Sequence, residues 1–147
     1  MNRQSQKKMI IVGMGERAMI YAKEALAHPE LFRIVGVVDV RPERVDLAKR
    51  TFDMPEENCF SSVEEMVKRP KFADAVINGT MDQQHVETSI PVLKAGYDLL
   101  LEKPFAVNQE EADRLLSCAH EAGRKVMICH VLRYAPFYKE MKTLLSN

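Results

Sequence analysis

The 147-residue sequence predicts an α/β fold, a doubly wound parallel sheet of the Rossmann type with helices on both faces. Short apolar runs rich in β-branched residues alternate along the chain with segments of helical spacing. The first run breaks at two glycines, Gly13 and Gly15, and the second ends at an acidic residue, Asp39. Because ligands of such sheets bind beyond the carboxyl ends of the strands, the loops that follow the strands form the candidate site.

The apolar runs predict strands, and the segments between them predict helices. The expected strands are residues 9–12, 33–40, 59–60, 73–80, 97–101 and 125–129, and the expected helices are residues 18–27, 43–51, 63–69, 83–95, 108–122 and 135–145. Residues 1–8 are polar and are expected to form a disordered tail. Residues 9–147 then form one domain, a size that suits a single hydrophobic core.

Turn and cap residues justify the helix boundaries. His28-Pro29 ends the first helix, and Pro42 lies where the second can begin. Ser62 and Glu65 have the spacing of a capping box at the start of the third helix. The later boundaries rest on Asn108, which caps the fifth helix, and on Gly96 and Gly123, which suit the left-handed position after the fourth and fifth helices.

Composition excludes several classes of partner. The chain has 21 Lys and Arg against 21 Asp and Glu, so no basic surface for nucleic acid or acidic lipid is expected, and the first apolar run is too short to cross a membrane. Its three cysteines lack metal-ligand spacing, and their odd number argues against a disulfide framework. We therefore expect a cytoplasmic protein with a small-molecule partner and no metal.

Gly13, Gly15 and Ala18 form the pattern Gly-x-Gly-x-x-Ala, a dinucleotide-binding fingerprint between a strand and a helix. Gly13 allows the tight turn, Gly15 lets a ligand approach the main chain, and Ala18 lets the helix pack closely on its strand. The first-turn amides and the positive end of the helix dipole would face a pyrophosphate. Glu16 and Arg17 lie in the same turn, where Glu16 is expected to point into solvent. Glycines also mark ordinary turns, so the pattern depends on its context.

Asp39 lies about 20 residues after the fingerprint, where the motif places an acid that hydrogen-bonds the adenosine ribose. Its carboxylate would repel a 2′-phosphate, which favours NAD over NADP as the cofactor. Arg41 could stack on adenine or contact such a phosphate. The alternative is that Asp39 is a polar strand end or a helix cap before Pro42.

Glu102-Lys103-Pro104 follows the apolar run 98–101, so its charged pair is expected at the carboxyl edge of the sheet, beside a bound nicotinamide. An ammonium group there would stabilise a developing alkoxide. A surface ion pair before a proline turn is the alternative for this pair considered alone.

In order and spacing these motifs resemble those of the Gfo/Idh/MocA oxidoreductase family. The resemblance covers nearly the whole chain and rests on the fingerprint, Asp39, residues 80–85, Ala95-Gly96, Glu102-Lys103-Pro104 and Arg133-Tyr134-Ala135-Pro136. In that family this stretch is the NAD(P)-binding Rossmann domain, and a mostly antiparallel substrate domain follows near where this chain stops. The resemblance therefore implies a fragment that lacks the substrate domain, binds NAD and turns over poorly on its own.

The implied activity of the full-length protein, expected to be a homo-oligomer, is hydride transfer between nicotinamide and a sugar, polyol or related hydroxyl compound. Its general base would come from the second domain. Gly-Glu-Arg-Ala-x-x-Tyr at residues 15–21 is reminiscent of a subgroup that includes NAD-dependent glycosidases, so NAD-assisted glycoside cleavage stays open. A non-catalytic module that senses a dinucleotide is the other alternative.

The resemblance also implies roles for single residues. Lys103 matches the family's lysine that orients and polarises the reacting hydroxyl or carbonyl, and Glu102 would hold Lys103 or the cofactor ribose. Thr80 and His85 would lie near the nicotinamide, with His85 in a supporting part, although a lone histidine early in a helix is usually a capping or surface residue. The family's Thr-Pro is replaced here by Thr80-Met81.

Arg133 and His130 would contact the substrate or the second domain, with a charged helix start as the alternative. The aromatic face of Tyr134, Phe137 and Tyr138 is expected to pack against the sheet or the second domain. The seam formed by residues 132–145 is expected to drive association.

Overall fold

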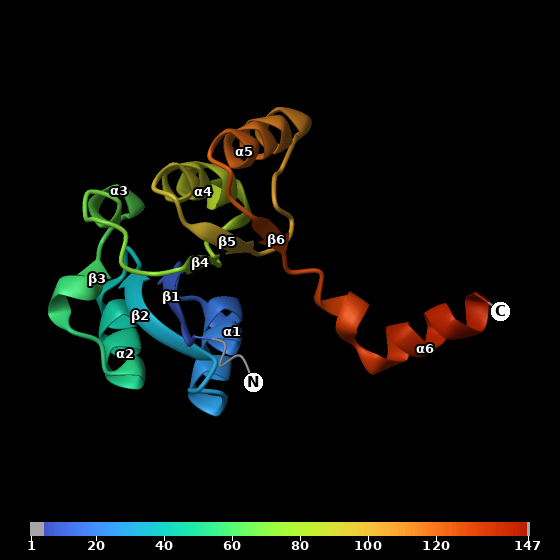
Figure 1. Cartoon of the computed structure of the whole chain (residues 1–147), viewed down its shortest axis with the longest axis horizontal. Helices are drawn as coiled ribbons and strands as arrows, with labels where there is room; N and C mark the ends of the chain where they lie inside the picture. Colours follow the sequence, from blue (N-terminus) through green and yellow to red (C-terminus); the bar gives the residue numbers. More distant parts are fainter. Residues whose placement is uncertain (1–4, 147) are drawn as a thin grey trace.

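A computed structural model describes residues 5–146 and contains one parallel sheet of six strands in the order β3-β2-β1-β4-β5-β6 (Figure 1). The strands are β1 (Lys7–Val12), β2 (Phe32–Val38), β3 (Cys59–Phe60), β4 (Ala75–Asn78), β5 (Asp98–Leu101) and β6 (Val126–Ile128). The helices are α1 (Glu16–Ala27), α2 (Pro42–Phe52), α3 (Val63–Met66), α4 (His85–Lys94), α5 (Gln109–Glu121) and α6 (Pro136–Leu145), with 3-10 turns η1 (Glu56–Asn58), η2 (Asp82–Gln84) and η3 (Val131–Tyr134). The predicted doubly wound fold is confirmed.

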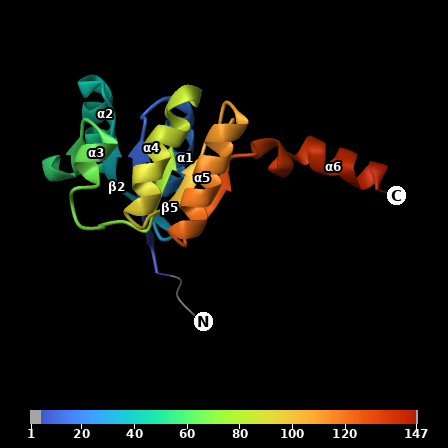
Figure 2. The same ribbon diagram turned by 90° about the horizontal axis from the view of Figure 1, so that it is seen from above.

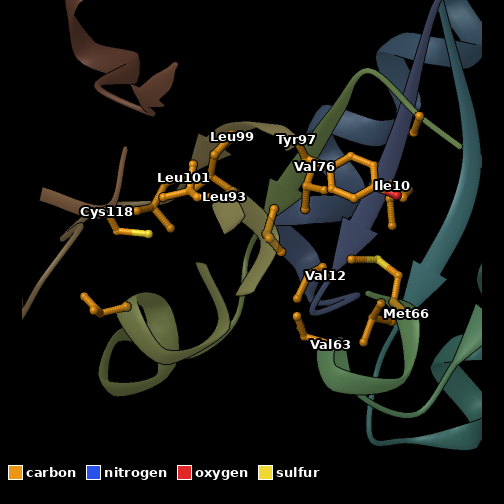
Figure 3. Close-up of a cluster of buried hydrophobic side chains, with 14 of the residues drawn as sticks. Ile10, Val12, Val63, Met66, Val76, Leu93, Tyr97, Leu99, Leu101 and Cys118 are labelled. Carbon is orange, nitrogen blue, oxygen red and sulfur yellow. The ribbon is translucent and has the colours of Figure 1, made fainter. Parts of the chain in front are cut away.

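Alternate side chains of the central strands supply two cores, one on each face of the sheet. Ile10 and Val12 point to the face covered by α3, α4 and α5, where Leu93 and Tyr97 are fully buried (Figure 3). Ile11 points to the opposite face, which α1 and α2 cover. Both faces of the sheet are therefore apolar, and polar groups of the strands are left to their ends.

The first strand begins earlier than the apolar pattern predicts. Lys7 and Lys8 belong to β1, so the predicted tail is wrong for these two residues, and residues 1–4 of that tail lie outside the described residues. The amide of Lys7 donates to the Leu31 carbonyl at 2.8 Å, and the amide of Lys8 donates to an Asp74 carboxylate oxygen at 2.8 Å. Backbone pairing extends the strand here while both lysine side chains stay in solvent, which apolar periodicity cannot reveal.

Helix caps follow the sequence closely, with two corrections. Gly96 and Gly123 have φ angles of +85° and +61°, as their predicted positions after helices require. The Ser62 hydroxyl accepts the Glu65 amide at 3.2 Å, but the Glu65 carboxylate binds the amide and hydroxyl of Ser61, so the capping box is not reciprocal. The helix predicted over 83–95 is divided into η2 and α4.

Helix α6 forms as predicted. Of the two alternatives for its aromatic side chains, packing against the sheet is wrong, and packing against a second domain stays a prediction. The helix extends away from the sheet in both views (Figures 1 and 2). It contains no buried residue, and Phe137 is 68% exposed. Within residues 5–146, no helix combines the length and the apolar composition of a membrane span.

Candidate functional site

The candidate site lies where the strand order changes direction, because β1 is flanked by β2 on one side and β4 on the other. The chain leaves β1 towards α1 and leaves β4 towards α4, on opposite faces of the sheet. Such a switch point separates two neighbouring loops and is the usual ligand crevice of an open parallel sheet.

The turn after β1 requires glycine at one position and tolerates a side chain at the other. Gly13 has a φ of +78°, and a Cβ there would lie 2.7 Å from the Thr80 amide nitrogen. A Cβ on Gly15 would meet nothing nearer than the Gly79 carbonyl oxygen at 3.9 Å. The fold therefore demands glycine at 13, whereas at 15 it leaves room over the main chain.

Helix α1 begins directly after this room, with no side-chain cap on its first turn. Its early amides are therefore donors without a side-chain acceptor, at the positive end of the helix dipole. Glu16 and Arg17 are exposed in this turn, and Ala18 is buried against Gly79, whose own Cβ would lie 2.9 Å from the Ala18 Cβ. Gly79 is thus a second glycine that the close approach of the two loops requires.

Asp39 fixes the glycine turn to the end of β2. One carboxylate oxygen accepts the Met14 amide at 2.7 Å, and the other accepts the Arg41 amide at 2.9 Å. The Arg44 guanidinium lies 3.5 Å from the first of these oxygens. Arg41, which is exposed, is the N-cap of α2 and receives no side-chain cap bond, so the helix-cap alternative for Asp39 is wrong.

Asn78 holds the loop after β4. Its amide nitrogen donates to the hydroxyls of Thr88 and Ser89 at 2.8 and 2.9 Å. Its carbonyl oxygen accepts the amide and the hydroxyl of Thr80 at 3.2 and 2.8 Å. The Thr80 hydroxyl is therefore engaged by the protein, and a cofactor would meet it in a fixed orientation.

His85 is fully buried and is not the surface residue that its early place in a helix suggests. Its Nδ1 lies 2.7 Å from the Pro104 carbonyl oxygen, and its Nε2 lies 3.1 Å from the Thr80 carbonyl oxygen. The ring thus joins the loop after β4 to the loop after β5, and the loop after β5 contains Lys103.

Glu102 is 6% exposed, and its carboxylate serves the main chain rather than the Lys103 ammonium group. One oxygen accepts the Lys103 amide at 2.9 Å. The other accepts the Tyr21 hydroxyl and lies 3.6 Å from the Arg17 guanidinium. Glu102 thus holds Lys103 through its main chain, while the Lys103 side chain is exposed at this edge.

Tyr21 and Cys129 are site residues that the sequence reasoning missed. Burial, followed by the bond to Glu102, raises the pKa of the Tyr21 phenol, and burial also raises the pKa of the neighbouring Cys129 thiol. Arg17 and Tyr21 are four residues apart on one helix face, a spacing that could have marked Tyr21 as a companion of the fingerprint.

Arg133 and His130 are not brought into this network. Both lie beyond β6 on the exposed segment that leads to α6. In the part of the chain that the structure describes, no side-chain hydrogen bond or ion pair joins them to the residues above. No group of three or more His, Cys, Asp or Glu in residues 5–146 is arranged to hold a metal ion.

The family model of the Gfo/Idh/MocA oxidoreductases, described as an oxidoreductase family with an NAD-binding Rossmann fold, matches residues 7–130. The chain belongs to this family. The resemblance of the sequence motifs and the expectation of an oxidoreductase-family nucleotide-binding domain are thereby confirmed.

Curated relatives are longer than this chain. Dehydrogenase aclE of Aspergillus oryzae is 31% identical over 118 residues, which are 80% of this chain and 32% of that protein. The 1,5-anhydro-D-fructose reductase of Ensifer adhaerens is 35% identical over 87 residues, 59% of this chain and 26% of the reductase. The chain thus spans about a third or less of the length of these relatives.

A solved structure supports the fold. The apo scyllo-inositol dehydrogenase of Lactobacillus casei superposes with a TM-score of 0.87 at 23% identity, covering 97% of this chain and 42% of that one. The high coverage includes nearly all the elements of the present chain, and at this identity the likeness is one of fold.

Proposed function

We propose that this chain is the cofactor-binding part of an NAD-dependent dehydrogenase acting on a sugar, polyol or related hydroxyl compound. The observation that carries the proposal is the uncapped first turn of α1 beside Gly15, where the fold leaves space that a Cβ would fill. Pyrophosphate oxygens would accept the first-turn amides there. When bound, the nicotinamide supplies the hydride chemistry, and the protein orients the reactants.

Asp39 supports the choice of NAD over NADP. Its carboxylate is held in place by the Met14 and Arg41 amides and retains acceptor capacity for ribose hydroxyls. A 2′-phosphate at this point would lie beside a buried negative charge, which costs affinity. Arg41, which is exposed, would stack on adenine.

Lys103 would act at the reacting oxygen. Its main chain is fixed through Glu102 and through the Pro104 contact of His85, while its ammonium group is exposed at the sheet edge. A cation held there stabilises negative charge that develops on a substrate oxygen. His85 and Thr80 would shape the nicotinamide end of the site, and Arg133 and His130 would meet the substrate or a further part of the longer protein.

Localisation and assembly belong to the same proposal. Three free thiols, on Cys59, Cys118 and Cys129, support a reducing cytoplasm. The apolar face of α6 supports a homo-oligomer for the longer protein.

Calorimetric titration of the chain with NAD and, separately, NADP tests the proposal. We expect NAD to bind at least about tenfold more tightly than NADP, and Asp39→Ser to narrow that ratio. Asp46→Ser, on the exposed side of α2, is the matched control and should leave both affinities unchanged. The proposal would be overturned if neither NAD nor NADP bound.

A further inference from the structure

The buried carboxylate of Glu102 needs hydrogen-bond donors, because burial of an ionised group without them is costly. Two are present, the Lys103 amide and the Tyr21 hydroxyl, and the Arg17 guanidinium adds an ion pair at 3.6 Å. The amide belongs to the neighbouring residue, whereas Tyr21 and Arg17 come from α1, more than 80 residues earlier in the chain. The carboxylate therefore depends on α1 for one of its two hydrogen bonds and for its ion pair.

Tyr21 is the half-buried member of the α1 pair, and Arg17 is the exposed one. The Arg17 guanidinium is half exposed and 3.6 Å away, so solvent screens its attraction. The Tyr21 hydroxyl bonds Glu102 directly, and the raised pKa of this phenol, which burial causes first and Glu102 second, keeps it protonated as a donor. The Cys129 thiol, in the segment directly after β6, is a neighbour of the Tyr21 phenol.

We propose that Tyr21 is a positioning residue that links the dinucleotide-binding helix to the loop of Lys103. Its hydroxyl fixes the Glu102 carboxylate, and that carboxylate fixes the main chain of Lys103. Tyr21 lies on the helix whose first turn would hold the pyrophosphate. Cofactor binding at α1 would therefore be coupled, through Tyr21 and Glu102, to the position of the Lys103 main chain. The link to the cofactor rests on the proposed function, whereas the link from Tyr21 to Lys103 does not.

Tyr21→Phe removes only the hydroxyl, and Tyr138→Phe, on exposed α6, is the matched control. Amide hydrogen exchange is measured in the ligand-free chain at Lys103 and at Ile11 in the core of β1. We expect exchange at Lys103 to accelerate about tenfold in Tyr21→Phe alone, with Ile11 unchanged. Unchanged protection at Lys103, or equal acceleration at both amides, would overturn the link.

A second measurement holds even if Tyr21→Phe fails to fold. In the unaltered chain the ultraviolet titration of the tyrosines should include two phenols that resist ionisation, because burial raises the pKa of both Tyr21 and Tyr97. Glu102→Gln should lower the pKa of Tyr21 towards the ordinary value and leave that of Tyr97 unchanged. If the pKa of Tyr21 is the same in Glu102→Gln as in the unaltered chain, burial alone raises it, and the contact between Tyr21 and Glu102 would be overturned.

Titration with NAD then separates this inference from the proposed function. In the unaltered chain NAD should shift the amide resonance of Lys103, and in Tyr21→Phe, at saturating NAD, that shift should be lost. If the unaltered chain binds no NAD, the proposed function fails while the exchange result stands. If NAD binds and shifts Lys103 equally in both chains, the coupling through Tyr21 is wrong.

Discussion

At the carboxyl edge of the sheet the polar residues Asp39, Asn78, His85 and Glu102 are buried, whereas on η3 and α6 large apolar side chains are exposed. Of the seventeen large apolar side chains exposed in residues 5–146, eight lie between 131 and 145. Both regions depart from the usual distribution of residues between core and surface.

The two regions differ in whether their side chains have partners within the chain. Every buried polar side chain named at the edge has hydrogen-bond partners within the chain, so the edge is preformed and its residues hold one another in place. The apolar side chains of α6 are not covered by the sheet. Substitutions should therefore be costly at the edge and nearly neutral for folding on α6.

Of the substitutions at the edge, Gly13→Ala is expected to have the largest effect on stability, and Gly15→Ala, in the same fingerprint, a small one. Gly13→Ala should lower the free energy of unfolding by about 3 kcal/mol. Alanine is strained at the positive φ of this position, and its Cβ would lie too close to the Thr80 amide nitrogen. Gly15→Ala should stay within about 0.5 kcal/mol, since its Cβ has space, yet weaken NAD about tenfold. Urea unfolding and calorimetry measure the two effects, and equal destabilisation by both variants would contradict this account.

Asn78→Ala should destabilise by about 2 kcal/mol, because it leaves the hydroxyl of Ser89 and the amide of Thr80 without a partner. Gln83→Ala, in the exposed turn η2, is the control and should change little. A cost for Asn78→Ala below about 0.5 kcal/mol would show that the loop after β4 is held by other contacts.

Alkaline pH provides a smaller test of the edge. The pKa values of Tyr21 and Cys129 are raised in the folded state, so the folded protein retains protons that the unfolded chain releases. Stability should be fully present below the ordinary thiol value of 9.0 and should fall as pH rises above it. Tyr21→Phe should make this decline shallower in urea unfolding at stepped pH, and a decline of the same steepness would count against the contact.

The sequence predicts the parts of this comparison that are local. Strand and helix order follows from apolar periodicity, and the turn of Gly13 follows from its spacing before a helix. Tyr21 could not be assigned in this way, because its partner Glu102 is 81 residues away and only the fold brings the two together. Asn78 could not be assigned either, because its role depends on how α4 folds back against the end of β4. Likewise, the pattern of α6 predicts an apolar face but does not specify what that face contacts.

The smallest effect on folding is expected on α6. Phe137→Ser should change the free energy of unfolding by less than about 0.5 kcal/mol, because the ring is mostly exposed and lies off the sheet. Phe60→Ser, on β3 and in the core, is the contrasting variant and should cost about 3 kcal/mol or more.

Association is where α6 should matter. Exposed apolar side chains gathered on one segment favour contact between molecules, so light scattering of the unaltered chain should show association that grows with concentration. Phe137→Ser combined with Leu144→Ser should reduce it, while Glu140→Ser, on the same helix, should not. If the chain stays monomeric at high concentration, the exposed apolar side chains of α6 do not drive association. The two regions would then differ only in how much their substitutions affect folding.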